Sequence, residues 1–513
     1  MVRLRLASWF HPASPSPPPN PSNTEFMKQG PRPSAPELST SSPEKKHHCQ
    51  KCESEDIDNS SSNMVRVPVS PKKKGSSTSP SLMITLTQKI SKETEKVEAY
   101  FRENGLQTPS FDVDAPNDFP DMPDDISRSR REVIHATQEL HDLMVGPRES
   151  VRWMAWDFIN TQALQLINHY GIAKLVPREG TITFSQLQCQ TSLDPVNLVR
   201  LVRHAITNHV FREPKPGSIA HTAASLALAS DESLQAWVGF NTEDVFPSSA
   251  HVLDALQRYP EATSLTRTGF NFAFDTVDRE PMFVTMGQDA ARARRMALAM
   301  SSLVAGEGYQ LSHLSSGCDL SDVDARGGTL VDLGSSHGFA CVHLATVYRR
   351  MRFVAQDLPK TIECAPAPVS ADAQVAARIE FQAHDFFTEQ PVRGADVYFF
   401  RWIMHNHSTP YAVKILQNLI PALKKGARII VNDYCVGEPG TQDPWDERQM
   451  RSMDLVMMTL LNAQERDEEG FRTLFKLAGE GFVFKGVTRP KGCRMSIIEA
   501  VWDPDAATDQ SSK

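Results

Sequence analysis

The sequence lacks the features that mark membrane-spanning and disulfide-stapled proteins. It has no run of about 18 apolar residues, the length that a helix needs to cross a bilayer. The start of the chain carries Arg3 and Arg5 but no apolar stretch adequate for a signal peptide. Its eight cysteines are scattered over 513 residues, which fits reduced thiols better than a disulfide framework. We therefore expect a cytoplasmic protein without a membrane partner.

An excess of positive charge is also missing. The 54 Lys and Arg residues are outnumbered by 62 Asp and Glu residues, giving a formal net charge of −8. This balance argues against a broad phosphate-binding face. A helix-like stretch at residues 197–209 carries Arg200, Arg203 and His204, which is no more than an ordinary solvated face. We expect no nucleic-acid partner.

Both ends of the chain lack the composition of a folded domain. Residues 1–84 are rich in Pro and Ser, and we expect them and residues 504–513 to be disordered. Cys49 and Cys52 follow two histidines but have no second Cys pair or spaced histidines nearby. The sequence therefore predicts no metal site there.

What the chain does contain is a series of four short apolar runs, each with a polar residue at or near its end. The runs cover residues 329–333, 352–359, 378–387 and 396–405, with helix-like stretches between them, and a fifth run at 428–433 ends in Asp433. Such alternation predicts β-α-β units and a parallel sheet. Ligands bind at the carboxyl ends of the strands in such sheets, so the four polar ends are expected to meet in one crevice.

The turn after the first run indicates the kind of ligand. A dinucleotide-binding turn reads Gly-x-Gly-x-x-Gly and faces a pyrophosphate. Here Asp332 is followed by Gly334 and Gly338 without the middle glycine, which disfavours a nicotinamide oxidoreductase. An acid inside the strand suits a cationic ammonium, and S-adenosylmethionine carries an ammonium, a sulfonium and no phosphate. A tight turn in some other α/β protein is the alternative.

The later strand ends agree with a nucleoside cofactor. Asp357 lies 25 residues after Asp332 (357 − 332), close to the usual offset of a ribose-binding carboxylate. Asp385 can accept from an adenine amino group, and Phe386 offers a stacking face. Each residue taken singly is more often a loop acid or a core aromatic, so the prediction depends on their order.

Seven motifs then appear in a recognisable order. They read GFNFAFDTVDREPMF, VDLGSSHG, FVAQDLP, AHDFF, FFRWIMHN, ARIIVNDY and NAQERDEEGF. In these motifs, residues 90–502 resemble the plant caffeate-type and fungal polyketide O-methyltransferases. The resemblance implies a Rossmann-like α/β domain with a mainly parallel seven-stranded sheet, after a helical, winged-helix-like dimerisation domain. It also implies a homodimer, S-adenosylmethionine as cofactor and a phenolic substrate from fungal polyketide chemistry.

Three residues take catalytic places in this resemblance. Methyl transfer to a phenol, whose pKa is about 10, benefits from a base, and His is the side chain best matched to that task near neutral pH. His405 ends the fourth run, where the family has its catalytic base. Asp433 and Glu465 take the places of the acids that flank this base. A lone strand-end His would more often be structural, and Glu465 could instead be one charge of a helix N-terminal cluster.

Two more residues take cofactor-contacting places, and two sites depart from the family. Leu358 directly follows Asp357. Arg401 stands where the family has a basic residue that contacts the cofactor. The alternative is that Arg401 forms a structural salt bridge at the edge of the sheet. Ser335 replaces a second loop glycine, which fits if its φ is negative. His405-Asn406-His407 replaces the common His-Asp-Trp. These departures leave open a weakened methyltransferase-like protein that acts as a regulator or scaffold.

The rest of the chain is divided around these motifs. We expect a dimerisation domain at 85–235, a helical connecting region at 236–320 and the methyltransferase domain at 321–503. Residues 83–146 are expected to be helical. Two apolar sets either line a substrate pocket or pack as core, and the sequence does not decide between these alternatives. They are Phe270, Phe272, Phe274, Met282, Phe283 and Met286, and then Met450, Met453, Met457 and Met458.

Overall fold

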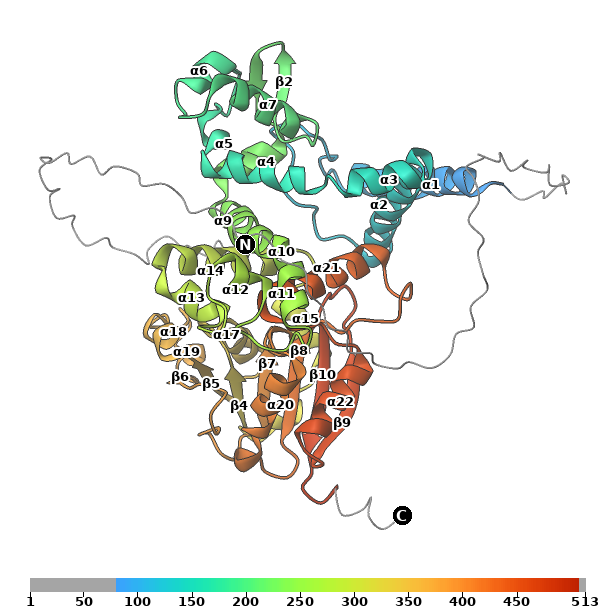
Figure 1. Ribbon diagram of the computed structural model, residues 1–513. Coiled ribbons are helices and arrows are strands. Elements are labelled where there is room, and N and C mark those ends of the chain that lie inside the picture. The colour runs from blue at the N-terminus through green and yellow to red at the C-terminus, as the bar shows by residue number, and fades with distance from the viewer. Residues whose placement is uncertain (1–79, 507–513) are drawn as a thin grey trace, which may run out of the picture. The chain divides into compact units, whose positions relative to one another are not determined.

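A seven-stranded sheet organises the second half of the described chain. The computed structural model describes residues 80–506, so the predictions for Cys49, Cys52 and both tails fall largely outside it. The strand order is β6-β5-β4-β7-β8-β10-β9, in which the strands from β6 to β8 are parallel and β10 is antiparallel to both of its neighbours, β8 and β9 (Figure 1). This sheet confirms the predicted Rossmann-like fold class. The strands are β4 (Thr329–Leu333), β5 (Arg352–Asp357), β6 (Ile379–Ala383), β7 (Val397–Arg401), β8 (Arg428–Asp433), β9 (Phe482–Thr488) and β10 (Ser496–Trp502).

Side chains that alternate along the strands build two hydrophobic cores, one on each face. Val331 of β4 and Tyr398 of β7 point into a core that α20 and α22 cover. Their neighbours Leu330 and Val397 point into the other core, against α17. This period of two follows from strand geometry and leaves both faces of the central strands buried. The helices of this region are α17 (Phe339–Val347), α18 (Pro359–Glu363), α19 (Ala373–Ala376), α20 (Thr409–Gln417), α21 (Pro444–Leu461) and α22 (Glu468–Ala478), with short 3₁₀ turns η2 (Met404–Asn406) and η3 (Ile420–Ala422).

The strands agree with the predicted runs to different extents. β4 and β8 begin and end at the predicted residues. β5 and β6 begin within one residue of the predicted runs but end earlier, at Asp357 and Ala383, so Asp385 and Phe386 lie just beyond β6. The fourth run was predicted to continue to His405, but β7 ends at Arg401 and His405 lies in η2. The reason is Trp402, whose left-handed φ of 57° turns the chain out of the sheet.

The N-terminal helical region is interrupted. The prediction of helix throughout residues 83–146 was wrong between α1 and α2, because prolines at 109, 116, 120 and 123 cannot continue a helix. Leu86 and Phe101 of α1 are buried, so at least part of this helix packs against its neighbours. These helices are α1 (Leu82–Glu103), α2 (Asp124–Val145) and α3 (Pro147–Met154).

A small three-stranded sheet with its own core follows. Its order is β1-β3-β2, and its antiparallel strands pack with short helices around Ile167, Leu198 and Ile219, as in a winged-helix module. The elements are α4 (Phe158–His169), α5 (Ile172–Leu175), β1 (Ile182–Thr183), α6 (Phe184–Gln188), α7 (Pro195–Ile206), β2 (Arg212–Lys215), β3 (Ser218–Ala220) and α8 (Ala223–Ser230).

Helices connect this module to the large sheet. They are α9 (Glu232–Phe240), the π-helix η1 (Asn241–Val245), α10 (Phe246–Ala250), α11 (Val252–Arg258), α12 (Gly269–Ala273), α13 (Met282–Gln288), α14 (Ala290–Val304), α15 (Leu311–Gly317) and α16 (Ser321–Ala325). Between residues 80 and 506, no helix is both long and apolar enough to cross a bilayer.

Candidate active site

The loop after β4 is a tight, hydrogen-bonded turn. The backbone N–H groups of Gly334 and Ser335 both donate to the carbonyl of Gln356 on β5, at 2.8 and 2.9 Å. Gly334 has φ 75°, and a Cβ there would collide with Ile403, so glycine is required at this position. Gly338, at φ 73°, caps α17. Ser335 has a negative φ, which is the condition under which serine fits this loop, whereas Ser336 takes the left-handed conformation at 52°.

Asp332 is a buried carboxyl directly beneath this loop. It is 2% exposed, and the Cys341 thiol donates to its Oδ2 at 3.5 Å. Burial raises the pKa of Asp332 to about 7, and the nearby Asp357 adds to this rise. Among the described residues Asp332 forms no ion pair, and Arg401 only partly offsets the rise in its pKa, so this acid is suited to a ligand that brings a cation.

Asp357 and Leu358 lie beside the same loop. The Asp357 carboxylate accepts from the backbone N–H of Ser336 at 2.8 Å and from that of Leu358 at 2.7 Å. A carboxylate has about four acceptor positions, so Asp357 retains capacity for hydroxyl donors. Leu358 is exposed, although it is a large apolar residue.

Asp385 and Phe386 approach the loop from the end of β6. Asp385 is exposed and accepts from the backbone N–H of Phe387 at 2.9 Å. Phe386 is half-buried, and a Cβ at Gly334 would lie 3.6 Å from its ring. The structure therefore brings together the ends of β4, β5 and β6, as the order of the motifs predicted.

Arg401 is directed into the protein. β7 is central in the sheet, so the alternative of a salt bridge at a sheet edge was wrong. Its guanidinium donates to Asn432 Oδ1 and to the carbonyl of Tyr309, the latter at 3.0 Å. Burial lowers the pKa of Arg401, and the charges of Cys493, Asp332 and Asp433 oppose this effect.

His405 and Glu465 form a buried pair. Nδ1 of His405 lies 2.8 Å from Glu465 Oε1, and both side chains are almost wholly buried. Burial by itself lowers the pKa of His405, but the charge and hydrogen bond of Glu465, with help from Asp433, outweigh it and raise the pKa. Within residues 80–506 no hydrogen bond engages Nε2. The pair therefore leaves one ring nitrogen available to a substrate.

Asp433 is placed differently from Glu465. Its Oδ2 accepts from the backbone N–H of His405 at 3.0 Å, so it holds the main chain and makes no hydrogen bond to the ring. The side chain is fully buried, and its Oδ1 has no partner among the described residues. Of the two acids that were expected to flank the imidazole, Glu465 therefore contacts the ring and Asp433 contacts the backbone of His405.

The turn around His405 explains the departures from the family. The side-chain amide of Asn406 donates to the carbonyl of Trp402 at 2.8 Å and closes the turn. An aspartate in this position could not donate this bond when ionised. His407 is buried against the edges of Phe386 and Phe387, and burial lowers its pKa to about 3. It is therefore a neutral imidazole at physiological pH.

Sequence reasoning missed Arg466. This buried residue donates to the carbonyls of Met404 and His407, both at 2.7 Å. The available signal was its position, because Arg466 is a single cation directly after Glu465 in an otherwise acidic segment.

The two apolar sets divide between core and surface. Phe270, Met282 and Met286 are buried in one core cluster with Met457 of α21, whereas Phe283 is exposed. Met450 packs in a neighbouring cluster with Tyr309 and Tyr434, and Met453 touches both clusters. The middle of α21 also contacts the site, because Asp454 accepts from the backbone N–H of Glu465 at 2.7 Å.

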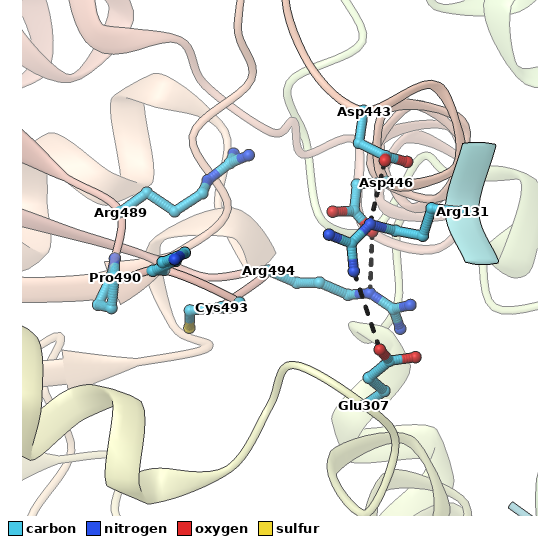
Figure 2. Close-up of a pocket in the computed structure, with 10 residues that line it drawn as sticks. Arg131, Glu307, Asp443, Asp446, Arg489, Pro490, Cys493 and Arg494 are labelled. Carbon is cyan, nitrogen blue, oxygen red and sulfur yellow. Dashed lines mark hydrogen bonds and ion pairs between the residues drawn. The ribbon is translucent and has the colours of Figure 1, made fainter. Parts of the chain in front are cut away.

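A separate cavity of about 270 Å³ lies next to α2 and α21 (Figure 2). Its walls include Arg131, Asp443, Asp446 and Arg494, and none of the predicted site residues lines it. Arg131 pairs with Asp443 at 3.1 Å and Arg494 with Asp446 at 3.2 Å. Most of the charged side chains that line this cavity therefore form ion pairs with one another. Among residues 80–506, no cluster of three potential metal ligands occurs.

Comparisons with known proteins agree with this geometry. The family model described as "O-methyltransferase domain" matches residues 283–482. The chain is 57% identical to the chlorophenol O-methyltransferase of Trichoderma longibrachiatum, over 84% of this chain and 92% of that protein. It is 36% identical to the O-methyltransferase pyvH of Aspergillus violaceofuscus, over 82% of this chain and 99% of that protein. Among solved structures, OxaC superposes with a TM-score of 0.64 at 23% identity, covering 82% of this chain and 100% of OxaC.

Proposed function

This chain belongs to the O-methyltransferase family, and we propose that it methylates a phenolic hydroxyl with His405 as the general base. It is an S-adenosylmethionine-dependent enzyme of class EC 2.1.1, of the kind found in fungal secondary metabolism. The observation that carries the proposal is the buried pair of His405 and Glu465, 2.8 Å apart, next to a loop suited to the cofactor.

The donor set at the strand ends fits S-adenosylmethionine. The glycine turn at residues 334–338 contains no Lys or Arg that could bind a phosphate. Around it lie three carboxyl groups, those of Asp332, Asp357 and Asp385. Asp332, which has a raised pKa and forms no ion pair within residues 80–506, matches the ammonium of the cofactor. Asp357 matches the ribose hydroxyls, and Asp385 matches the adenine amino group.

Apolar and backbone groups complete the proposed cofactor site. Phe386 and the exposed Leu358 would flank the adenine, while Gly334 and Gly338 let the loop approach the ligand. Arg401 would stabilise the neighbouring end of β7 through its hydrogen bonds to Asn432 and to the carbonyl of Tyr309. S-adenosylmethionine supplies a methyl group already activated by its sulfonium, so the protein has to position the phenol and remove its proton.

His405 takes that proton at Nε2. Glu465 accepts from Nδ1–H, which fixes the tautomer that leaves Nε2 able to accept, and it stabilises the imidazolium that forms. Asp433 fixes the main chain of the base, so the ring keeps its position. A phenol with a pKa of about 10 is mostly neutral at pH 7, and a base of this kind raises its reactive fraction.

The substrate class rests on the relatives. The 57% identity to a chlorophenol O-methyltransferase supports a small chlorinated phenol as first candidate. Chlorine substituents withdraw electrons and make the phenol more acidic, which eases the removal of its proton. The expectation of a polyketide phenol stays a second candidate, supported by relatives such as pyvH and bik3 only through their shared family.

A homodimer is proposed from exposed apolar side chains on α1 to α3 and just beyond. Such a group on a soluble surface marks a covered interface. Sedimentation of the purified chain as a monomer would contradict this proposal. The domain division at 85, 236 and 321 and the cytoplasmic compartment remain predictions. The exposed apolar side chains are Leu82, Met83, Ile84, Leu143, Met144, Val151, Trp153, Met154, Trp156 and Phe158.

The test is methyl transfer to a monochlorophenol, which keeps most of its phenolic proton at neutral pH, by wild type and by His405→Gln. We expect the substitution to lower kcat by about 10²- to 10⁴-fold, the usual scale of general-base loss, while S-adenosylhomocysteine still binds. His251→Gln is the matched control, because His251 pairs with Asp254 at 3.1 Å but is solvent-exposed. Full activity of His405→Gln would remove the base from the mechanism. A wild type that binds S-adenosylhomocysteine but methylates no phenol would favour the regulator alternative.

A further inference from the structure

A single guanidinium spans the turn that carries the base. Nη1 of Arg466 donates to the carbonyl of Met404 and Nη2 donates to that of His407, each at 2.7 Å. These two carbonyls bracket His405 in the sequence. Both bonds are charge-assisted, and such bonds are shorter and stronger than neutral ones. The fork geometry of arginine can bridge two acceptors at fixed spacing, which the single ammonium of lysine cannot match.

Arg466 is itself firmly anchored. It is 3% exposed, and its backbone forms a parallel bridge with Cys435 just beyond β8. The backbone N–H of Val436 donates to the carbonyl of Arg466 at 3.0 Å. The next residue, Asp467, caps α22 through the N–H of Gly470. Arg466 therefore ties the His405 turn to the end of β8 and the start of α22.

The surroundings keep this cation charged. Burial lowers the pKa of Arg466 to about 10, and Asp433 and Glu465 oppose that fall, so the group is ionised at neutral pH. A buried charge is tolerated only when it is paired and hydrogen-bonded. Here the carboxylates of Asp433 and Glu465 supply opposite charge, and the two carbonyls supply acceptors.

We propose that Arg466 is a positioning residue for the methyl transfer, holding the 404–407 turn so that His405 faces the phenol, and tuning the charge around that base. The inference rests on the proposed role of His405. Arg466 touches neither substrate nor cofactor in this account, and it acts through the backbone that bears the imidazole. A displacement of about 1 Å in such a turn can cost about 10²-fold in rate.

The charge contribution has a defined sign. Glu465 and Asp433 raise the pKa of His405, and Arg466 lowers it. His407, which lies beside the His405 ring, is neutral at physiological pH. Asp454 accepts a hydrogen bond from the backbone N–H of Glu465. Removing the Arg466 cation leaves the two carboxylates unopposed, so the pKa of His405 rises. The acid limb of the pH profile of kcat, where turnover is lost as His405 becomes protonated, then moves to higher pH.

The experiment compares Arg466→Lys and Arg466→Met with Arg472→Met as control. Arg472 lies on α22, pairs with the exposed Glu468 and Glu469 and stacks over the Phe484 ring, and none of these partners is a proposed site residue. Monochlorophenol turnover is measured against pH at saturating S-adenosylmethionine, with S-adenosylhomocysteine affinity as the check of folding. We expect kcat to fall about 10-fold in the lysine variant, with the acid limb unmoved, and about 10²-fold in the methionine variant, with the limb at higher pH. Because the ionisation of the substrate is common to all variants, a shift of the limb reports the enzyme.

The outcomes separate this inference from the function on which it rests. Wild-type kcat in Arg466→Lys, or a methionine variant that binds S-adenosylhomocysteine with unchanged kcat and limb, would overturn the positioning role. If the methionine variant does not bind S-adenosylhomocysteine, the kcat of the lysine variant alone tests the positioning role. An active His405→Gln enzyme would instead remove the base itself, and the role of Arg466 with it.

Discussion

At the scale of single residues, three side chains hold the turn that carries His405, two of them at His405 itself and one at its neighbours. Glu465 binds the ring nitrogen Nδ1, Asp433 accepts from the backbone N–H, and Arg466 binds the carbonyls on either side. This division of tasks means that substitutions at the three positions have distinguishable effects. Those at Glu465 act on the ring, whereas those at Asp433 and Arg466 act on its backbone.

The charge of Glu465 predicts a pH effect opposite to that of Arg466. Since Glu465 raises the pKa of His405, its neutral replacement Glu465→Gln lowers that pKa. The base then stays unprotonated to lower pH, so the acid limb of kcat moves downward. We also expect kcat itself to fall about 10- to 10²-fold, because the imidazolium loses its stabilising charge. Turnover against pH checks this, and a limb that stays or moves upward would refute the assignment of Glu465 as the electrostatic partner.

At the scale of elements, the loop between β4 and α17 depends on one glycine. Gly334 combines a left-handed φ of 75° with a closely packed Ile403, so Gly334→Ala adds both strain and a collision. Gly394 has a similar φ of 69° with no atom near its virtual Cβ, so Gly394→Ala adds strain alone. We expect Gly394→Ala to lower the free energy of unfolding by about 1 kcal/mol and Gly334→Ala by roughly 2–4 kcal/mol.

Urea unfolding of the two variants measures this difference. S-adenosylhomocysteine binding should weaken only in Gly334→Ala, because only that loop belongs to the proposed cofactor site. Equal losses of stability in both variants would show that the contact with Ile403 carries no cost.

Elements also mark where sequence reasoning succeeds. The ends of β4 and β8 could be predicted because these buried parallel strands read as mainly apolar runs, the first stopping before Gly334 and the second at Asp433. The end of β7 could not, since Trp402 takes a left-handed conformation that its sequence does not signal. That conformation depends on tertiary contacts, including the packing of Trp402 against Tyr434.

At the scale of the whole molecule, the fold class and the family could be inferred from motif order, but the site network could not. Motifs in sequence order specify which strand ends meet. The contact of Arg466 with residues 404 and 407 joins segments about sixty residues apart and has no local pattern. Likewise, Asp433 and Glu465 both qualified as partners of His405, and only the packed structure separates the ring from the backbone contact.

The central claim is that His405 and Glu465 act as one catalytic unit in methyl transfer to a phenol. The most direct measurement is the single-turnover rate for wild type, His405→Gln, Glu465→Gln and the double variant, at saturating S-adenosylmethionine and monochlorophenol. Groups that act as a unit are non-additive, so the double variant should be about as slow as His405→Gln alone. If the two losses instead multiply, Glu465 acts independently of His405, and the proposed unit is contradicted.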